Sequence, residues 1–271
     1  MEKDGEVITT HDDQFAEKES WFEGLKFGSM IQYTNSAKEE IVDWAQEAIK
    51  MNMKLTDECP VDQTWIYNPD FDHKGDPGRY AENLTARGVA ARLTGASKPA
   101  MSLFGSGSQG IAATLPVYAY GKVKDYSIKE ISRSTLLSFL VTMFIKSKQG
   151  RLSPVCGTAL AAGAGSACAI VYLSGGGEDT MESAIANIAG DLTGIICDGA
   201  SFGCSLKAGT GANSAIKAAE LALNDIRIPR GTGVVGGNIQ ETISNLGNIS
   251  NPGMVEANDR ILSMMASRKH V

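Results

Sequence analysis

The sequence predicts a mainly α-helical protein, namely a compact multi-helix domain built on small-residue helices, with a short mixed α/β segment at its N-terminus. After residue 36, segments rich in Ala, Leu and Glu with helical periodicity outnumber β-branched runs. The 30 glycines and many alanines are concentrated after residue 88, and small residues let helices approach closely. Two Ser-x-x-Glu sequences mark helix starts.

Residues 1–35 alternate short apolar clusters with polar residues, which predicts short strands and loops. The clusters are Val7-Ile8, Trp21-Phe22 and Met30-Ile31. A helical domain is expected to begin at residue 36 and to continue to residue 271.

The first predicted helix begins with a capping box at Ser36 and Glu39 and runs to about Leu55. Its apolar face consists of Ile41, Ala45, Ala48 and Ile49. Three prolines between residues 56 and 78 predict a loop there. Helices are then expected at Tyr80–Thr94, from the capping box of Ser127 and Glu130 to near Gly150, and at 157–173, 180–196, 212–223, 238–246 and 255–266.

Two glycine-rich segments, Gly105–Gly110 and Gly231–Gly236, fit the pattern G-x-G-x-x-G. A dinucleotide site needs a strand before the glycines and a continuous helix after them. Pro116 is expected to interrupt a helix after the first segment, and no strand pattern precedes the second. A Rossmann fold is therefore disfavoured.

Charge and composition exclude several classes of partner. The net charge of −6 and the pI near 5.2 argue against nucleic-acid binding. Residues 152–177 carry no charge, but they are mostly Gly, Ala and Ser, which insert poorly into lipid. Length alone favours a membrane span, and composition favours a buried core helix. We expect no membrane association.

The N-terminus and the cysteines indicate a reducing compartment. The first five residues are acidic and polar, unlike a secretory signal peptide. The cysteine count is five, and an odd number without a signal peptide predicts free thiols rather than a disulfide framework. The expected location is cytoplasmic.

Three of the cysteines stand beside glycine at predicted breaks between helices, namely Cys156, Cys197 and Cys204. Their separations of 41 and 7 residues are weak evidence for a metal site, because buried free cysteines are common. Structural zinc is a further alternative, although closed zinc sites have four ligands. Cys168 lies within a predicted small-residue helix and is expected in the core, and Cys59 lacks the glycine-rich setting.

Several motifs together resemble the L-cysteine desulfidase group of the serine dehydratase alpha-chain superfamily. The resemblance covers roughly residues 40–268, and its most distinctive block is Gly190–Cys204. The other motifs are Lys98–Ser102, Gly105–Ile111, Ala113–Pro116 and Cys204–Lys207.

The resemblance implies that Cys156, Cys197 and Cys204 bind a [4Fe–4S] cluster with one iron left open as a Lewis acid. The activity that it implies is α,β-elimination, a lyase reaction on a small amino acid in amino-acid catabolism. L-Cysteine would give pyruvate, ammonia and sulfide, and L-serine would give pyruvate and ammonia. Pyridoxal phosphate is not required.

The sequence departs from the family in three respects. Residues 1–35 look like the remnant of a longer N-terminal α/β region that carries a further cysteine. Ser108 replaces an asparagine of the glycine turn, and no cysteine lies near the C-terminus. The chain is therefore expected to need a separate N-terminal chain or to form a homo-oligomer. The alternative is an inactive fragment, or a cluster-bearing subunit that functions only with a partner.

Four polar residues near the motifs are candidates for binding and catalysis. Lys207 and Asp198 are the catalytic candidates, against a surface lysine and a helix-capping aspartate as alternatives. Ser106 and Gln109 are expected to bind substrate, because the glycine turn has no evident packing role. Asp191 has the same two alternatives as Asp198. The histidines at 11, 73 and 270 are isolated in sequence, so none is expected to act as the base.

Overall fold

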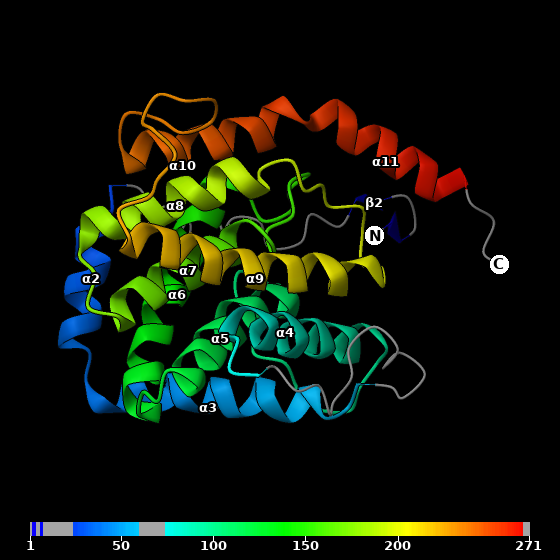
Figure 1. Ribbon diagram of the computed structural model, residues 1–271. Coiled ribbons are helices and arrows are strands. Elements are labelled where there is room, and N and C mark those ends of the chain that lie inside the picture. The colour runs from blue at the N-terminus through cyan, green and yellow to red at the C-terminus, as the bar shows by residue number, and fades with distance from the viewer. Residues whose placement is uncertain (1, 4–5, 8–23, 60–73, 268–271) are drawn as a thin grey trace.

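The computed structural model describes residues 2–3, 6–7, 24–59 and 74–267, and it confirms the mainly α-helical class (Figure 1). Two short strands, β1 (Glu2–Lys3) and β2 (Glu6–Val7), pair antiparallel with Glu2 opposite Val7. The helices are α2 (Phe27–Ser36), α3 (Glu39–Thr56), α4 (Pro77–Leu93), α5 (Gly107–Val123), α6 (Ile128–Gln149), α7 (Ala161–Leu173), α8 (Glu178–Leu192), α9 (Gly203–Leu223), α10 (Ile239–Asn248), the π-helical turn η3 (Ile249–Gly253) and α11 (Val255–Ser267).

The small-residue helix α7 forms the centre of the core. It packs against α5, α6, α8 and α9, and every residue from Ala161 to Val171 is buried. A Cβ added at Gly165 would lie 2.5 Å from Ser138 O, so α6 and α7 approach through backbone contact. The uncharged segment of the sequence is therefore a core helix. None of the described helices is long and apolar enough to cross a bilayer.

Helix α5 passes through Pro116 without ending, contrary to the prediction that this proline interrupts it. Proline lacks the N–H that would bond to the carbonyl four residues earlier, at Ala112. In the structure Ser166 Oγ on α7 donates a hydrogen bond of 2.9 Å to Ala112 O. The neighbouring helix thus satisfies the carbonyl that the proline leaves open.

One of the two predicted capping boxes is present. The Ser127 side chain accepts from the backbone N–H of Glu130, and the Glu130 carboxylate accepts from the backbone N–H of Ser127. The box at Ser36 and Glu39 is wrong, because Ser36 is the last residue of α2 and its hydroxyl donates to Gln32 O. Helix α3 therefore begins without a side-chain cap, although its predicted buried face is confirmed at Ala45, Ala48 and Ile49.

The region before residue 36 contains a helix where strands and loops were predicted. Phe27, Met30 and Thr34 are buried at helical spacing along α2, so the cluster at Met30-Ile31 belongs to a helix. Val7 lies in β2. Ile8 and the Trp21-Phe22 cluster lie outside the described residues.

Helix α9 begins at Gly203, nine residues before the predicted start. Three glycines at positions 203, 209 and 211 lower the helical propensity of this stretch. Gly211 is needed for packing, because a Cβ there would lie 2.7 Å from Ala159 Cα. Tertiary contact therefore compensates for weak local preference. The second glycine pattern, 231–236, lies in the loop between α9 and α10, as predicted.

Candidate functional site

A cavity of about 350 Å³ brings together residues from five separate parts of the chain. Its wall includes the end of α4, the glycine turn before α5, the last turns of α6, the segment 151–158 and the segment 197–204. The lining residues that bear on its chemistry are Arg92, Ser106, Ser108, Gln109, Lys146, Arg151, Cys156, Thr158, Cys197 and Cys204.

Backbone pairing places two of the three cysteines side by side. Val155 and Ile196 form an isolated antiparallel bridge. Cys156 N donates to Ile195 O at 2.8 Å, and Cys197 N donates to Pro154 O at 2.7 Å. Side chains alternate across extended backbone, so both cysteines lie on the face opposite Val155 and Ile196. Both cysteines line the cavity, and so does Val155.

Cys204 reaches the same cavity from the first turn of α9. Its thiol donates to Gly199 O at 3.2 Å, across a turn that Gly199 permits through its φ of +90°. Cys168 is fully buried within α7, and Cys59 is partly buried after α3. Neither lines the cavity. Cys168 is thus a core residue, as expected, and the three glycine-flanked cysteines line one cavity.

The pKa of the Cys156 thiol is shifted by its surroundings. Burial raises the pKa of the Cys156 thiol above its ordinary value, and the nearby Cys197 and Cys204 raise that pKa further. Among the described residues, no three His, Cys, Asp or Glu side chains are close enough to hold a single metal ion. The described part of the site is therefore a group of three thiols that line one cavity.

The glycine turn supplies polar groups to the cavity. Ser106 Oγ accepts the backbone N–H of Gln109 at 3.3 Å, so this hydroxyl caps α5. The Gln109 side chain is 6% exposed and lies against Gly157, where an added Cβ would be 3.1 Å from the amide carbon. Its Oε1 has no hydrogen-bond partner among the residues that the structure describes. A buried acceptor without a partner costs stability, and it is ready to accept from a bound ligand.

Lys207 and Asp198 form an ion pair beside the cavity and are not among its lining residues. Lys207 Nζ also donates to Ile196 O at 3.0 Å, next to Cys197. The pair therefore fixes the backbone that carries this cysteine. Asp191 is paired with Lys217 on the outside of α8 and α9, at 2.9 Å. The three histidines lie outside the described residues.

Sequence reasoning missed three cations in the cavity wall, Lys146, Arg92 and Arg151. Lys146 follows a long apolar stretch of α6 and lies four residues after Thr142 and seven after Phe139, both buried. Helical spacing alone therefore places it on the buried face. No sequence pattern predicted that the two arginines line the cavity, because only the fold brings the end of α4 and residue 151 to the glycine turn.

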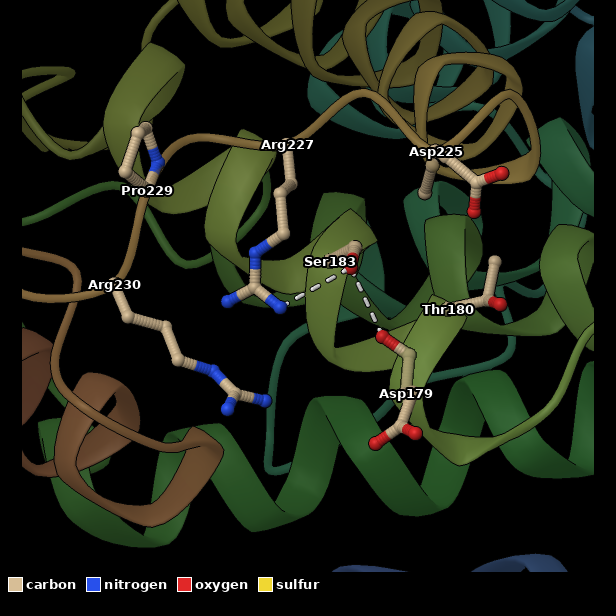
Figure 2. Close-up of a pocket in the computed structure, with 8 residues that line it drawn as sticks. Asp179, Thr180, Ser183, Asp225, Arg227, Pro229 and Arg230 are labelled. Atoms are coloured by element: carbon tan, nitrogen blue, oxygen red, sulfur yellow. Dashed lines mark hydrogen bonds between the residues drawn. The ribbon is translucent and has the colours of Figure 1, made fainter.

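A larger cavity, of about 680 Å³, lies between the start of α8 and the chain that follows α9 (Figure 2). Arg227 and Arg230 each pair with Glu182 Oε1, at 3.7 and 3.1 Å, and Arg227 also donates to Ser183 Oγ. Two aspartates in the wall offset the two arginines. Because its described lining residues include no thiol, this cavity is not the candidate site.

Comparison with known families gives one match. The family model described as serine dehydratase alpha chain matches residues 8–263. This range includes every residue of the candidate site. No solved structure matches the chain.

Three relatives of this chain are longer proteins whose names state no activity. A UPF0597 protein of Clostridium botulinum (strain Okra / Type B1) is 38% identical over 245 residues, which are 89% of this chain and 57% of the relative. UPF0597 proteins of Desulfotalea psychrophila and Caldanaerobacter subterraneus are 35% and 33% identical, over 94% and 99% of this chain and 60% and 65% of their own lengths. The chain thus spans about three-fifths of these relatives.

Proposed function

We propose, on the premise that this chain belongs to the serine dehydratase alpha-chain family, that it forms the cluster-bearing part of an amino-acid lyase. The observation that carries the proposal is the meeting of Cys156, Cys197 and Cys204 at one cavity, from three segments far apart in sequence. Cysteines that only fill the core are not expected to line the same polar cavity. Free cysteines that serve packing lie instead in apolar surroundings, as Cys168 does.

The donor set fits a [4Fe–4S] cluster held by these three cysteines. The sulfur atoms of thiolates that bind one [4Fe–4S] cluster are about 6–7 Å apart, whereas those of thiolates that bind a single zinc ion are about 4 Å apart. Three thiols around a shared space, without a tight mononuclear arrangement, suit the larger spacing. When bound, the cluster supplies an iron with an open position that acts as a Lewis acid toward the leaving group.

Gln109 and the glycine turn bind the amino-acid substrate in this proposal. Gln109 Oε1 accepts from the substrate's α-ammonium group, which gives this buried oxygen its missing partner. Ser106 holds Gln109 in place by capping α5. Lys207 and Asp198 act as positioning residues, since their ion pair and the bond to Ile196 O keep Cys197 at the cavity.

The proposed reaction is α,β-elimination. The substrate loses its α-proton and its β-substituent, and the resulting aminoacrylate takes up water to give pyruvate and ammonia. L-Cysteine releases sulfide and L-serine releases water, and both substrates have the α-carboxylate and α-ammonium groups that the cavity matches. The free thiols suit a reducing compartment, so we place the activity in the cytoplasm.

The base that removes the α-proton belongs, in this proposal, to the part of the relatives that this chain does not match. Three apolar side chains in the segments that carry the cysteines are exposed, with Leu152 94% exposed, Leu206 45% and Ile196 38%. These are suited to cover by a separate N-terminal chain or a second copy of this chain. The second candidate function, a cluster-bearing subunit without activity of its own, rests on the same observation.

Iron binding tests the proposal. The chain is reconstituted without oxygen, and iron, sulfide and visible absorption are measured. Four irons per chain are expected, and Cys197→Ser, Cys156→Ser and Cys204→Ser should each lose the absorption. Cys168→Ala is the matched control and should keep it. Full iron retention in all three serine variants would contradict the ligand assignment.

Turnover separates the two candidate functions in the same preparation. The reconstituted chain alone should release pyruvate from L-cysteine or L-serine about 10²–10⁴-fold more slowly than the chain supplied with the remaining segment of a relative, because a missing base costs about that factor. Equal rates would place the base within this chain. No turnover in either case, with the cluster intact, would favour the inactive subunit.

A further inference from the structure

The glycine turn before α5 holds an aromatic residue in an unfavourable backbone conformation. Phe104 and Gly105 have φ angles of +51° and +79°. Leu103 and Ser106 form an isolated antiparallel bridge around them, with backbone hydrogen bonds of 3.1 and 2.9 Å in the two directions. Positive φ at both central residues is the mark of a type I′ turn, whose favoured sequences are Asn-Gly and Asp-Gly. Gly105 fits this turn, and Phe104 does not.

Phe104 is an exception among the residues with positive φ. The described part of the chain contains four non-glycine residues of this kind, namely Lys74, Phe104, Asp125 and Asp225. Asp125 and Asp225 lie two residues after the ends of α5 and α9, where a left-handed residue commonly ends a helix, and aspartate tolerates this region better than most side chains. Phe104 is the only aromatic residue of the four. A strained residue at a candidate site is an observation from which a functional hypothesis can start.

Core packing does not account for the conformation of Phe104. Its side chain is half-buried. Among the described residues, Phe104 belongs neither to the hydrophobic core nor to the partly buried side chains that pack against the core. Three other phenylalanines, Phe27, Phe139 and Phe144, are at most 4% exposed in the core and lie in regular helices. Phe104 instead lines the cavity that contains the three cysteines.

Contacts on both sides of the turn hold it in this conformation. The backbone N–H of Met101, two residues before the bridge, donates to Asn52 Oδ1 at 3.0 Å, and Asn52 Nδ2 donates to Gly110 O at 3.3 Å. A Cβ added at Gly110 would overlap Met101 O, so this segment lies directly on α5. Ser106, at the other end of the turn, caps α5. Strained backbone persists where neighbouring contacts fix it, and these contacts fix Phe104 at the cavity wall.

We infer that Phe104 contacts the side chain of the amino-acid substrate and determines which β-substituents the cavity accepts. The inference rests on the proposed function and deepens it, since it adds a specificity-determining residue to the amino-acid site. Phe104 is the only aromatic residue among the described residues that line the cavity, and Gln109 lies on the same wall, three residues after the turn. With the α-ammonium group at Gln109, the ring is the apolar surface against which the β-carbon and its substituent pack.

The test compares ligands that differ only at the β-position. Glycine, L-alanine and L-2-aminobutyrate share the α-carboxylate and α-ammonium groups, carry no leaving group, and add apolar surface in steps of one carbon. Calorimetry measures their affinities in metal-free and in cluster-loaded protein without oxygen. The parent chain should bind L-2-aminobutyrate about five- to tenfold more tightly than glycine, because each fully buried methylene strengthens binding about fourfold. L-Alanine should lie between the two.

Two variants separate the ring from the backbone strain. Phe104→Ala and Phe104→Asn both remove the ring, so both should reduce the preference for L-2-aminobutyrate over glycine to about twofold or less, with the affinity for glycine unchanged. Only asparagine suits the first central position of a type I′ turn, so Phe104→Asn should unfold at a temperature about 2–4 °C above that of Phe104→Ala. The control Trp44→Ala removes a half-exposed aromatic ring of α3 that does not line the cavity, and it should keep the preference.

The outcomes distinguish this inference from the cluster proposal. An unchanged ligand preference in Phe104→Asn or Phe104→Ala overturns the inference. An equal loss of affinity for glycine and L-2-aminobutyrate also overturns it, because a purely structural role would give that result. Equal stability of the two variants, or no amino-acid binding in either state of the parent chain, overturns it as well. Failure to bind iron overturns the cluster proposal alone, because the ligand preference is then measured in the metal-free chain.

Discussion

The core around α7 and the rim of the cysteine cavity are both built from glycine, alanine and serine, but they use these residues in opposite ways. In α7 the small side chains allow helix backbones to touch, and the residues from 161 to 171 are all buried. In the rim segment 194–204 they leave open space, with Gly194, Cys197 and Ala200 exposed. Glycine therefore serves close packing of backbones in α7, as at Gly165, and turn formation in the rim segment, as at Gly199.

Substitution of one glycine in each region should separate the two uses most clearly. Gly165→Ala on α7 would overlap Thr142 Oγ1 and lie 2.5 Å from Ser138 O. We expect it to lower the free energy of unfolding by about 3 kcal/mol. This is the upper end of the usual cost of overpacking a core, because the backbone atoms cannot move away from the added methyl group. Gly194→Ala meets no atom within 4 Å and should change it by less than about 0.5 kcal/mol. Urea denaturation measures both, and equal losses would contradict the distinction.

The bond between α7 and the proline-containing helix should have an intermediate effect. Ser166→Ala leaves the buried carbonyl of Ala112 without a partner, at a cost of about 1–3 kcal/mol. Pro116→Ala restores an N–H that reaches the same carbonyl, so Ser166→Ala should cost about 1 kcal/mol less in that background. A double-mutant cycle measured by denaturation gives the coupling. Additive effects would show that Ser166 does not replace the missing N–H.

The smallest expected effect is the pH dependence of the core cysteine. Burial raises the pKa of the Cys168 thiol above the ordinary value of 9.0. Below about pH 9 the thiol is protonated in both states and contributes its full stability. Above about pH 9 the unfolded chain binds fewer protons than the folded one, so the free energy of unfolding falls by about 1.4 kcal/mol per pH unit.

Cys168→Ala should remove this contribution. Between pH 9 and pH 10 the parent protein should lose about 1 kcal/mol more stability than the variant, as measured by urea denaturation in reducing buffer. The other buried thiol and the tyrosines with raised pKa values are present in both proteins, so their contributions cancel. The same slope in both proteins would show that Cys168 ionises freely in the folded state.

Local signals in the sequence predicted most of the helices and the position of Cys168 in the core. The capping box at Ser127 needs only residues three positions apart, and it formed as predicted. The box at Ser36 failed because the preceding segment is itself a helix, which the short apolar clusters did not indicate. A helix start that depends on local hydrogen bonds can thus be predicted from the sequence when the chain before it is not helical.

The errors and omissions involve partners distant in sequence. Pro116 is tolerated because Ser166, fifty residues later, bonds to the carbonyl that the proline leaves open. Arg92 and Arg151 reach the cavity only after α4 and α6 have packed around α5. No local sequence pattern predicts these long-range contacts. The burial of Lys146 could have been predicted from the sequence, because its helical spacing from Thr142 and Phe139 places it on a buried face.

The antiparallel bridge between residues 155 and 196 has a consequence for the order of assembly. Closing a loop of about 40 residues costs roughly 3 kcal/mol of chain entropy, and here backbone hydrogen bonds at Cys156 and Cys197 hold that loop closed through protein atoms alone. Cys156 and Cys197 of the proposed cluster site are therefore held near each other by the fold itself. The proposed cluster would then assemble on a site that is already folded, unlike a zinc finger, in which the metal must gather its own ligands.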